Sequence, residues 1–289
     1  MNLQESQIID LKARAHLSDI YRRFGKGDSA HCFESLFIWK EDMNLTVTYG
    51  DDIYLVKDNS SRETYFFPVG SDTAKKEIIA TLLDRGQVRF EYMTDEDVSF
   101  TKENFSDRFR FTESPDSSEY IIDRETMQNL PGSSFSKDRG HINKLLKSHV
   151  METRDIHDIT KEVLFDIIIG WDASKHMYEN IPDECATKNI INNLNELDLE
   201  GIVLLMDGVP CSICAGFNLS PDTVDCVIQK NRLSQQGLTY YLRQEYARLQ
   251  PDSVKFFNWE EDLGIEGLRR AKQLMRPVRM ITMYTGTGI

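Results

Sequence analysis

The pattern of apolar and polar positions predicts the same order of elements in both halves of the chain. Short apolar runs indicate strands, and apolar stripes with a period near 3.6 residues indicate helices. The second half is predicted to contain strands at 201–206, 209–217 and 223–229, a helix at 238–249, a strand at 254–258, a helix at 265–275 and a strand at 278–284. Asp207-Gly208, between the first two strands, is a strong hairpin signal.

The first half repeats this order with different residues. It is predicted to contain strands at 45–50, 53–57 and 64–69, a helix at 73–84, a strand at 87–93, a helix at 95–105 and a strand at 119–123. Two helical stretches precede each series, at 8–21 and 31–43, and again at 160–169 and 184–197. Two matched series in one chain favour two copies of one domain, even though their sequences are not visibly similar.

The boundary between the two copies is predicted near a helix at 140–149, before a strand at 150–155. Residues 1–148 then form an N-terminal domain with its linker helix, and residues 149–289 form a C-terminal domain. The repeated order is that of the GNAT acyltransferase fold, in which a mixed sheet splays open between its central strands. The predicted class is therefore α/β in the wider α+β sense, with two tandem GNAT-like domains whose splayed sheets are flanked by helices.

Length and composition narrow the function classes. A chain of 289 residues is comfortable for two domains, and it has no apolar run of membrane-spanning length. The first residues lack a basic stretch followed by an apolar one, so the sequence predicts a cytoplasmic protein. A net charge of −13 argues against a dedicated nucleic-acid-binding protein, although a local basic cleft remains compatible with it.

The five cysteines are expected to be free thiols. Cys211 and Cys214 form a C-x-x-C pattern, but no second pair of Cys or His residues completes a tetrahedral metal site. Because the pattern also lies within an apolar strand, we expect both side chains in the core, and we predict no metal.

The segment from Asn258 to Lys272 joins a predicted strand, a polar turn and an amphipathic helix. Asp262 either caps that helix or acts in proton transfer and in recognition of a substrate ammonium group. Glu260 shares the turn with a second glutamate, and by alternation one of the two should face the cleft. Asn258 ends the strand, where a structural turn bond and a ligand contact are equally compatible.

A second polar cluster lies on the predicted linker helix. Lys137, His141 and Lys144 are spaced to share one helix face, and Arg139 flanks them. Arg139 or Lys144 is suited to a phosphate, and His141 is suited to proton transfer near neutral pH. The alternative is a solvated helix face, which is also the usual explanation for the cationic run from Arg269 to Arg276.

These segments resemble the soluble C-terminal domain of phosphatidylglycerol lysyltransferases. The residues that carry the resemblance are Asn258–Lys272, Tyr120–Glu125, Leu130-Pro-Gly132 and Lys137–Lys144. The resemblance implies two packed GNAT-like domains and transfer of an aminoacyl group from aminoacyl-tRNA to phosphatidylglycerol or another acceptor. It also implies substrate-binding roles for Asn143 and Lys272, which belong to the matching motifs.

The chain departs from the family pattern after the Leu-Pro-Gly turn, where the family is usually more basic. It has serine at 133, 134 and 136, aspartate at 138, and glycine at 140 in place of the usual asparagine. Fewer cations weaken phosphate attraction. Two alternatives therefore stay open: an N-acyltransferase that uses acetyl-CoA, and a non-catalytic ligand-binding module. The place of a coenzyme A loop, Arg232–Gly237, has a single glycine.

The sequence thus predicts catalytic roles for Asp262 and His141, and substrate binding by Lys137, Arg139, Asn143, Lys144, Asn258, Glu260 and Lys272. No cofactor is predicted other than the aminoacyl-tRNA donor, with acetyl-CoA as the weaker alternative. The expected acceptor is an anionic lipid or a peptide at the membrane surface, so a protein that is peripheral to the membrane is an alternative to a purely cytoplasmic one.

Overall fold

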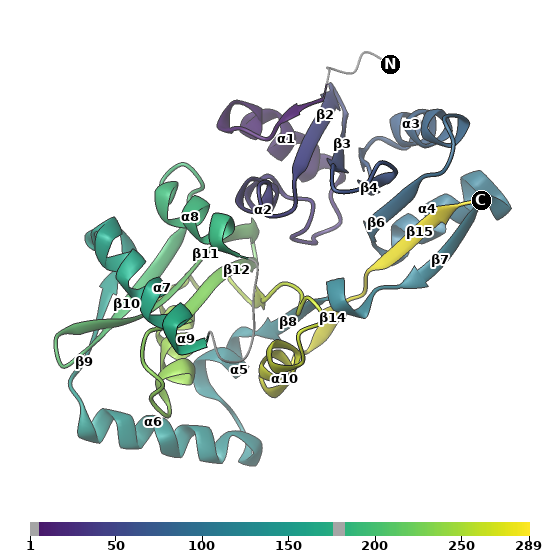
Figure 1. Ribbon diagram of the computed structural model, residues 1–289. Coiled ribbons are helices and arrows are strands. Elements are labelled where there is room, and N and C mark those ends of the chain that lie inside the picture. The colour runs from purple at the N-terminus through teal and green to yellow at the C-terminus, as the bar shows by residue number, and fades with distance from the viewer. Residues whose placement is uncertain (1–5, 176–182) are drawn as a thin grey trace.

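The computed structural model describes residues 6–175 and 183–289, which form two lobes. Figure 1 shows one mixed sheet in each lobe, with helices packed on it and with the C-terminal strand returning to the N-terminal lobe. The lobes meet where helices α2 (Phe33–Trp39) and α8 (Glu184–Asn192) contact each other.

The sheet of the first lobe has the strand order β1-β2-β3-β4-β6-β15-β7, and β5 pairs with β3. Its strands are β1 Gln7–Ile8, β2 Leu45–Gly50, β3 Ile53–Asp58, β4 Thr64–Phe66, β5 Val69–Gly70, β6 Arg89–Met93, β7 Phe109–Glu113 and β15 Tyr284–Gly288. Besides α2, its helices are α1 Arg14–Phe24, α3 Asp72–Asp84 and α4 Asp95–Phe105. The central pair, β4 and β6, runs parallel.

The sheet of the second lobe has the order β14-β8-β13-β12-β11-β10-β9. Its strands are β8 Glu119–Asp123, β9 Met151–Asp155, β10 Glu200–Met206, β11 Val209–Ser220, β12 Thr223–Asn231, β13 Phe256–Asn258 and β14 Arg279–Ile281. Besides α8, its helices are α5 Arg124–Asn129, α6 Ser136–Ser148, α7 Lys161–Lys175, α9 Leu238–Leu249 and α10 Glu266–Leu274. Here the parallel pair is β12 with β13.

The predicted order of three strands, helix, strand, helix and strand is present in both lobes. Two strand assignments were wrong. The strand that follows α4 is β7, whereas β8 pairs with β13 and β14 in the second sheet. The predicted strand at 278–284 is split into β14 and β15, which belong to different sheets. Local periodicity identifies a strand but not its partner, so it does not reveal such exchanges. The predicted domain boundary falls between residues 148 and 149. Strand β8 precedes it in sequence but belongs to the sheet of the second lobe, and β15 follows it but belongs to the sheet of the first lobe.

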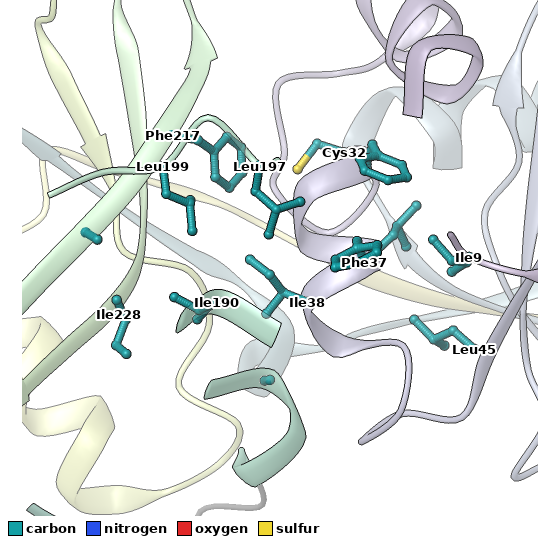
Figure 2. Packing of buried hydrophobic residues seen from close by; sticks show 14 of the residues in the cluster. Ile9, Cys32, Phe37, Ile38, Leu45, Ile190, Leu197, Leu199, Phe217 and Ile228 are labelled. Carbon is teal, nitrogen blue, oxygen red and sulfur yellow. The ribbon is translucent and has the colours of Figure 1, made fainter. Parts of the chain in front are cut away.

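One hydrophobic cluster extends across both lobes. Helix α2 is apolar on nearly every side, a pattern that is typical of a helix buried all round. Its Phe37 and Ile38 are 4% and 1% exposed and belong to the same cluster as Ile190 of α8. Figure 2 shows Ile38 next to Ile190, with Leu197 and Leu199 of the second lobe near them, whereas Phe37 points toward Ile9 and Leu45 of the first lobe. The arrangement of the lobes is therefore fixed by packing rather than by a linker.

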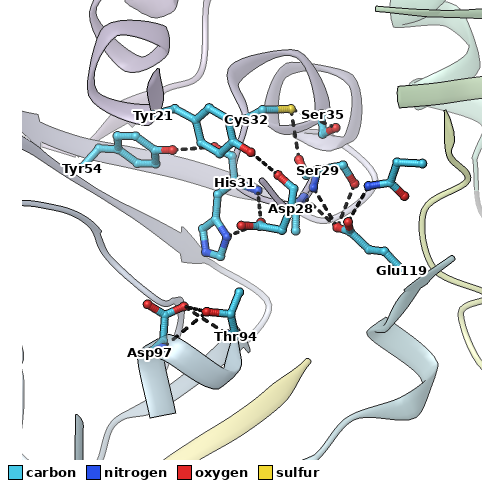
Figure 3. A network of polar contacts seen from close by, with 12 residues as sticks. Tyr21, Asp28, Ser29, His31, Cys32, Ser35, Tyr54, Thr94, Asp97 and Glu119 are labelled. Atoms are coloured by element: carbon cyan, nitrogen blue, oxygen red, sulfur yellow. Dashed lines mark hydrogen bonds and ion pairs between the residues drawn. The ribbon is translucent and has the colours of Figure 1, made fainter. Parts of the chain in front are cut away.

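A buried polar network crosses the same junction (Figure 3). Glu119, at the start of β8, is fully buried, and its Oε1 accepts hydrogen bonds from the backbone N and Oγ of Ser29 at 2.8 and 2.9 Å. Its Oε2 accepts a hydrogen bond from Nδ2 of Asn258 at 2.5 Å. Nearby, Nδ1 of His31 lies 2.6 Å from Oδ1 of Asp28. Glu119 thus joins a loop of the first lobe to β8 and β13.

Glu119 should make the stability of the fold depend on pH. Burial, and next the charge of Asp28, raise its pKa from 4.5 to about 8. The folded chain therefore binds this proton more tightly than the unfolded chain, and the resulting stabilisation is complete below about pH 4.5 and is lost as pH rises through about 8. From about pH 5 to pH 9, we expect the free energy of unfolding to fall by about 4 kcal/mol more in the wild type than in Glu119→Gln.

Urea denaturation at several pH values measures this difference. Glu77→Gln, which changes an exposed glutamate on α3, is the control and should keep the wild-type pH dependence. Parallel curves for the wild type and Glu119→Gln would show that Glu119 carries no proton-linked stability.

Candidate functional site

A cavity of about 730 Å³ opens where the central strands of the second sheet separate. Strands β12 and β13 form only a short parallel pair, in which Thr223–Asp225 of β12 lie beside Phe256–Asn258 of β13. Beyond this point β12 continues to Asn231 along β11, while the chain after Asn258 turns away. Residues 226–231 therefore have a strand partner on one edge only, and the other edge borders the cavity.

The equivalent place in the first lobe is filled. Strands β4 and β6 also form a parallel pair, over Thr64–Phe66 and Arg89–Glu91. Next to them, Phe66 and Tyr92 pack with ring centroids 4.5 Å apart. The space that these two rings border, with Trp39 and Glu260, measures only about 20 Å³. At this position in the sheet, the second lobe therefore has a cavity large enough for a small-molecule ligand, and the first lobe does not.

All three tryptophans of the chain border this cavity. Trp39 comes from α2 in the first lobe, Trp171 from α7, and Trp259 follows β13. Amide and hydroxyl side chains occupy other parts of the wall, namely Gln229, Asn231, Gln235, Gln236 and Thr239. A cavity of this size with aromatic surfaces and a few polar groups is typical of a ligand site.

Two buried cations belong to the wall. Nζ of Lys230 lies 2.8 Å from Oδ2 of Asp183 and 4.1 Å from the centroid of the Trp171 ring. The guanidinium of Arg243 lies 4.9 Å from the centroid of the Trp259 ring, and its Nε donates to Oε1 of Gln229 at 2.7 Å. Both side chains are held in place by aromatic and polar neighbours, and the charge of Lys230 is paired with that of Asp183, which also borders the cavity.

Another part of the wall is acidic. Glu260 and Glu261 border the cavity together with Lys272. Nζ of Lys272 donates to the carbonyl oxygens of Trp259 and Glu261, which fixes the turn between β13 and α10. Glu260 has a left-handed φ of 52°, and its N–H donates to Oδ1 of Asn258 at 2.8 Å. Asn258 thus makes the predicted turn bond.

Burial shifts the proton affinities of this group. Burial, and next the charge of Glu261, raise the pKa of Glu260 from 4.5 to about 8. Burial also raises the pKa of Glu261 and lowers the pKa of Lys272. Charge is thus disfavoured on each of these side chains, and a ligand that brings a positive charge will favour ionised carboxylates.

Asp262 lies behind this turn and does not border the cavity. It is fully buried, and it accepts hydrogen bonds from Tyr120 Oη at 2.5 Å and from Nε and Nη2 of Arg269 at 2.8 Å each. Burial alone raises its pKa, but the bonds from Arg269 and Tyr120 lower it overall. Of the two predicted alternatives, the helix cap is not formed as such, because Ile265 is the N-cap residue of α10, although Oδ1 of Asp262 accepts the backbone N–H of Gly264 at 2.9 Å. The aspartate instead anchors α10 to β8.

The cluster on the linker helix lies elsewhere. Lys137, Arg139, His141, Asn143 and Lys144 all belong to α6, and none of them borders the cavity. Helix α6 packs on α9, and Nη1 of Arg139 donates to the carbonyl oxygens of Leu130 and Gly132. The structure therefore brings together Asn258, Glu260 and Lys272 of the predicted residues, and it keeps the α6 cluster apart from them.

Two further sequence features find packing explanations. Gly237, in the possible coenzyme A loop, has φ of +86°, and a Cβ there would lie 2.7 Å from the carbonyl oxygen of His141. The glycine is needed for the close approach of α6. Cys211 and Cys214 are fully buried in the core of the second lobe. Within residues 6–175 and 183–289, no group of three or more His, Cys, Asp and Glu side chains is arranged to hold a metal ion.

Comparison with known proteins decides the family. Residues 21–286 match the family described as "Phosphatidylglycerol lysyltransferase, C-terminal". This chain belongs to that family. No protein with a curated description matches it. In the described residues of this family member, no helix is long and apolar enough to cross a membrane.

Solved structures of similar proteins have the same two-lobed fold. A conserved protein of unknown function from Bacteroides thetaiotaomicron matches with a TM-score of 0.87 and 22% identity, over 99% of both chains. L-PGS from Bacillus licheniformis matches with a TM-score of 0.67 and 14% identity, over 98% of this chain and 93% of that one. FemX matches with a TM-score of 0.60 and 11% identity, over 98% and 97%. The predicted α+β architecture of tandem GNAT-like domains is confirmed.

Sequence reasoning missed five residues that border the cavity: Trp39, Trp171, Trp259, Lys230 and Arg243. The scarcity of tryptophan was a usable signal for these positions, since the chain has only three. Nothing in the local pattern marks Lys230 or Arg243, because cationic residues on a strand and on a helix are usually exposed.

The Asp262–Arg269 pair predicts a loss of stability in Asp262→Asn. The asparagine side chain has no negative charge, and its NH2 group would face the N–H and O–H donors of Arg269 and Tyr120. We therefore expect the free energy of unfolding to fall by about 1–3 kcal/mol. Asp116→Asn is the matched control, because Asp116 pairs with the same arginine from an exposed position. It should change stability by less than about 1 kcal/mol. Equal losses in chemical denaturation of the two variants would contradict the anchoring role of Asp262.

Proposed function

We propose that this protein transfers an aminoacyl group from aminoacyl-tRNA to an acceptor, which is a lipid of the phosphatidylglycerol type or another nucleophile. The observation that carries the proposal is the cavity at the separation of β12 and β13, which combines a free strand edge, an acidic turn and two buried cations. Membership of the lysyltransferase C-terminal family supplies the reaction class.

The chemistry requires little covalent participation by the protein. The ester of aminoacyl-tRNA is already activated, so an acceptor oxygen or nitrogen can attack it directly while the tRNA hydroxyl leaves. The protein has to position both partners, remove a proton from the acceptor and stabilise the oxyanion. In a strand, alternate residues turn their N–H groups to opposite edges. The free edge of residues 226–231 therefore offers N–H donors to the oxyanion.

Glu260 and Glu261 are placed to receive the ammonium group of the aminoacyl moiety. In the empty site Glu260 is largely protonated near neutral pH, because its pKa is raised to about 8. An ammonium group nearby favours the carboxylate, so binding releases a proton. Lys272 acts as a positioning residue, since it holds the carbonyl groups of the turn. In this proposal Lys230 and Arg243 face the donor's phosphates, and the tryptophans stack on its terminal base.

The remaining predicted residues keep roles outside the cavity. Asp262 is proposed to position the acidic turn through Arg269 rather than to touch the reacting atoms. Lys137 and Lys144 are exposed on α6, where they are free to meet the phosphates of a tRNA body. His141, Asn143 and Arg139 are proposed to support that surface.

Aminoacyl transfer is tested directly by incubating the protein with charged tRNA and candidate acceptors. We expect acceptor-dependent loss of the aminoacyl ester, with kcat/KM reduced roughly 100-fold in Glu260→Gln, because loss of one partner of a buried charge pair costs about 2–5 kcal/mol. Glu77→Gln on α3 should retain wild-type activity. Turnover of acetyl-CoA instead of charged tRNA, or no turnover with any acceptor, would contradict the proposal.

Ligand binding should depend on pH with a defined sign. Because the carboxyl groups must lose their protons to pair with an ammonium group, affinity for a non-hydrolysable aminoacyl-adenosine should rise between about pH 5.5 and 7.5. The rise should be absent in the Glu260→Gln/Glu261→Gln double variant. Intrinsic fluorescence is a suitable signal, because every tryptophan borders the cavity. Affinity that is flat or falling over this range in the wild type would exclude ammonium recognition by these residues.

A further inference from the structure

The outer side of α10 and the chain that follows it combine exposed apolar side chains with arginines. We define the α10–β14 patch as Arg270, Leu274, Arg276, Val278 and Met280. Leu274, Val278 and Met280 are 55%, 53% and 39% exposed. Arg270 and Arg276 are also exposed, and neither forms an ion pair within the described parts of the chain. Figure 1 shows both elements below the junction of the two lobes.

The patch is unusual in both composition and charge. One exposed leucine is normal on a protein surface, but three large apolar side chains within seven residues form a locally apolar surface. Strand β14 is the edge of its sheet, so no neighbouring strand covers it. Two arginines without carboxylate partners are also unexpected in a chain whose net charge is −13.

The two apolar residues of the patch at β14 share one face of that strand. Val278 donates its N–H to the carbonyl oxygen of Ile121, so the ladder with β8 begins there. Alternation then places Val278 and Met280 on one side of β14, and Arg279 on the other side, where its guanidinium lies 5.3 Å from the centroid of the Phe256 ring. On α10, Arg270 and Leu274 are one turn apart and point the same way.

The patch adjoins the cavity along α10. Gly267, Leu268, Ala271 and Lys272 of this helix border the cavity. Leu274 comes three residues after Ala271 and seven after Gly267, so it lies next to their side of the helix, and a surface bound to the patch would lie beside the cavity.

We propose that the α10–β14 patch docks the protein on an anionic membrane surface. The arginines meet phosphate headgroups, while Leu274, Val278 and Met280 enter the interfacial layer. A nucleic acid backbone also presents phosphates to the arginines, but it does not bury the exposed apolar side chains as a lipid interface does. The composition of the patch therefore favours a lipid surface. The acidic remainder of the protein is repelled by such a surface, which leaves this face to make the contact. The inference extends the proposed function, because it would bring the cavity next to a lipid acceptor.

Vesicle sedimentation tests docking without donor or turnover, so it can fail independently of aminoacyl transfer. The full chain should bind vesicles of phosphatidylglycerol mixed with phosphatidylcholine at low salt, and it should bind pure phosphatidylcholine weakly. An arginine near an anionic surface contributes roughly fivefold to binding, so Arg270→Gln/Arg276→Gln should bind roughly 25-fold more weakly. Leu274→Ser/Val278→Ser should also reduce binding. Leu146→Ser/Lys147→Gln, which changes exposed residues on α6, is the matched control and should bind like the wild type.

Circular dichroism melts would establish that all variants remain folded. Absence of vesicle binding by the folded wild type would overturn the proposal. Binding that is insensitive to both patch variants, or that is lost only in the α6 control, would also overturn it. Membrane docking by the patch would be equally excluded if the patch variants lose binding to tRNA, or lose self-association in sedimentation, while their vesicle binding stays unchanged.

Discussion

The side chain of Asn258 holds together the features on which the site depends. Asn258 is the last residue of β13 that pairs with β12, and the cavity begins where the chain leaves the sheet after this residue. Its Oδ1 accepts the N–H of Glu260, which stabilises the left-handed turn, and its Nδ2 donates to Glu119. Because Glu119 also bonds to Ser29, one buried amide links the first lobe, the second sheet and the acidic turn.

The same region contains several buried acidic side chains that are not fully paired with cations or hydrogen-bond donors. Asp225, the β12 partner of Asn258, is fully buried, and both of its carboxylate oxygens lack a hydrogen-bond partner in the described structure. Burial, and next the charge of Glu260, raise the pKa of Asp225 well above its usual value. A protein that keeps such groups around a cavity sacrifices stability when the site is empty, and it regains favourable interactions when a cation enters. This is the physical basis of the proposal that the acidic turn recognises the substrate.

The fold was largely predictable, because its strands and helices have strong local periodicity. Helix α9 begins and ends at the predicted residues, and the Asp207-Gly208 turn joins β10 to β11. What the local pattern did not contain was strand partnership. The Glu119–Asp123 strand pairs across the lobes, and the C-terminal end of the chain divides between two sheets, because these pairings are decided by packing of residues far apart in the sequence.

The site was less predictable for the same reason. The terminal motif directed attention to Glu260 and Lys272, which border the cavity, and to Asn258 beside them, yet Trp39 reaches the cavity from the other lobe and Lys230 from a different strand. The α6 cluster had suitable chemistry and helical spacing, but helix packing placed it on another surface. The predicted roles of Asp262 and His141 stay predictions, and the contacts of Asp262 favour structural support.

The most direct test of the account is a crystal structure with a non-reactive aminoacyl-adenosine bound. The account predicts that the acyl carbonyl lies against the free edge of residues 226–231, with the ammonium group at Glu260 and Glu261 and the base against tryptophan. A ligand bound along α6 instead, with the cavity between β12 and α10 empty, would contradict it.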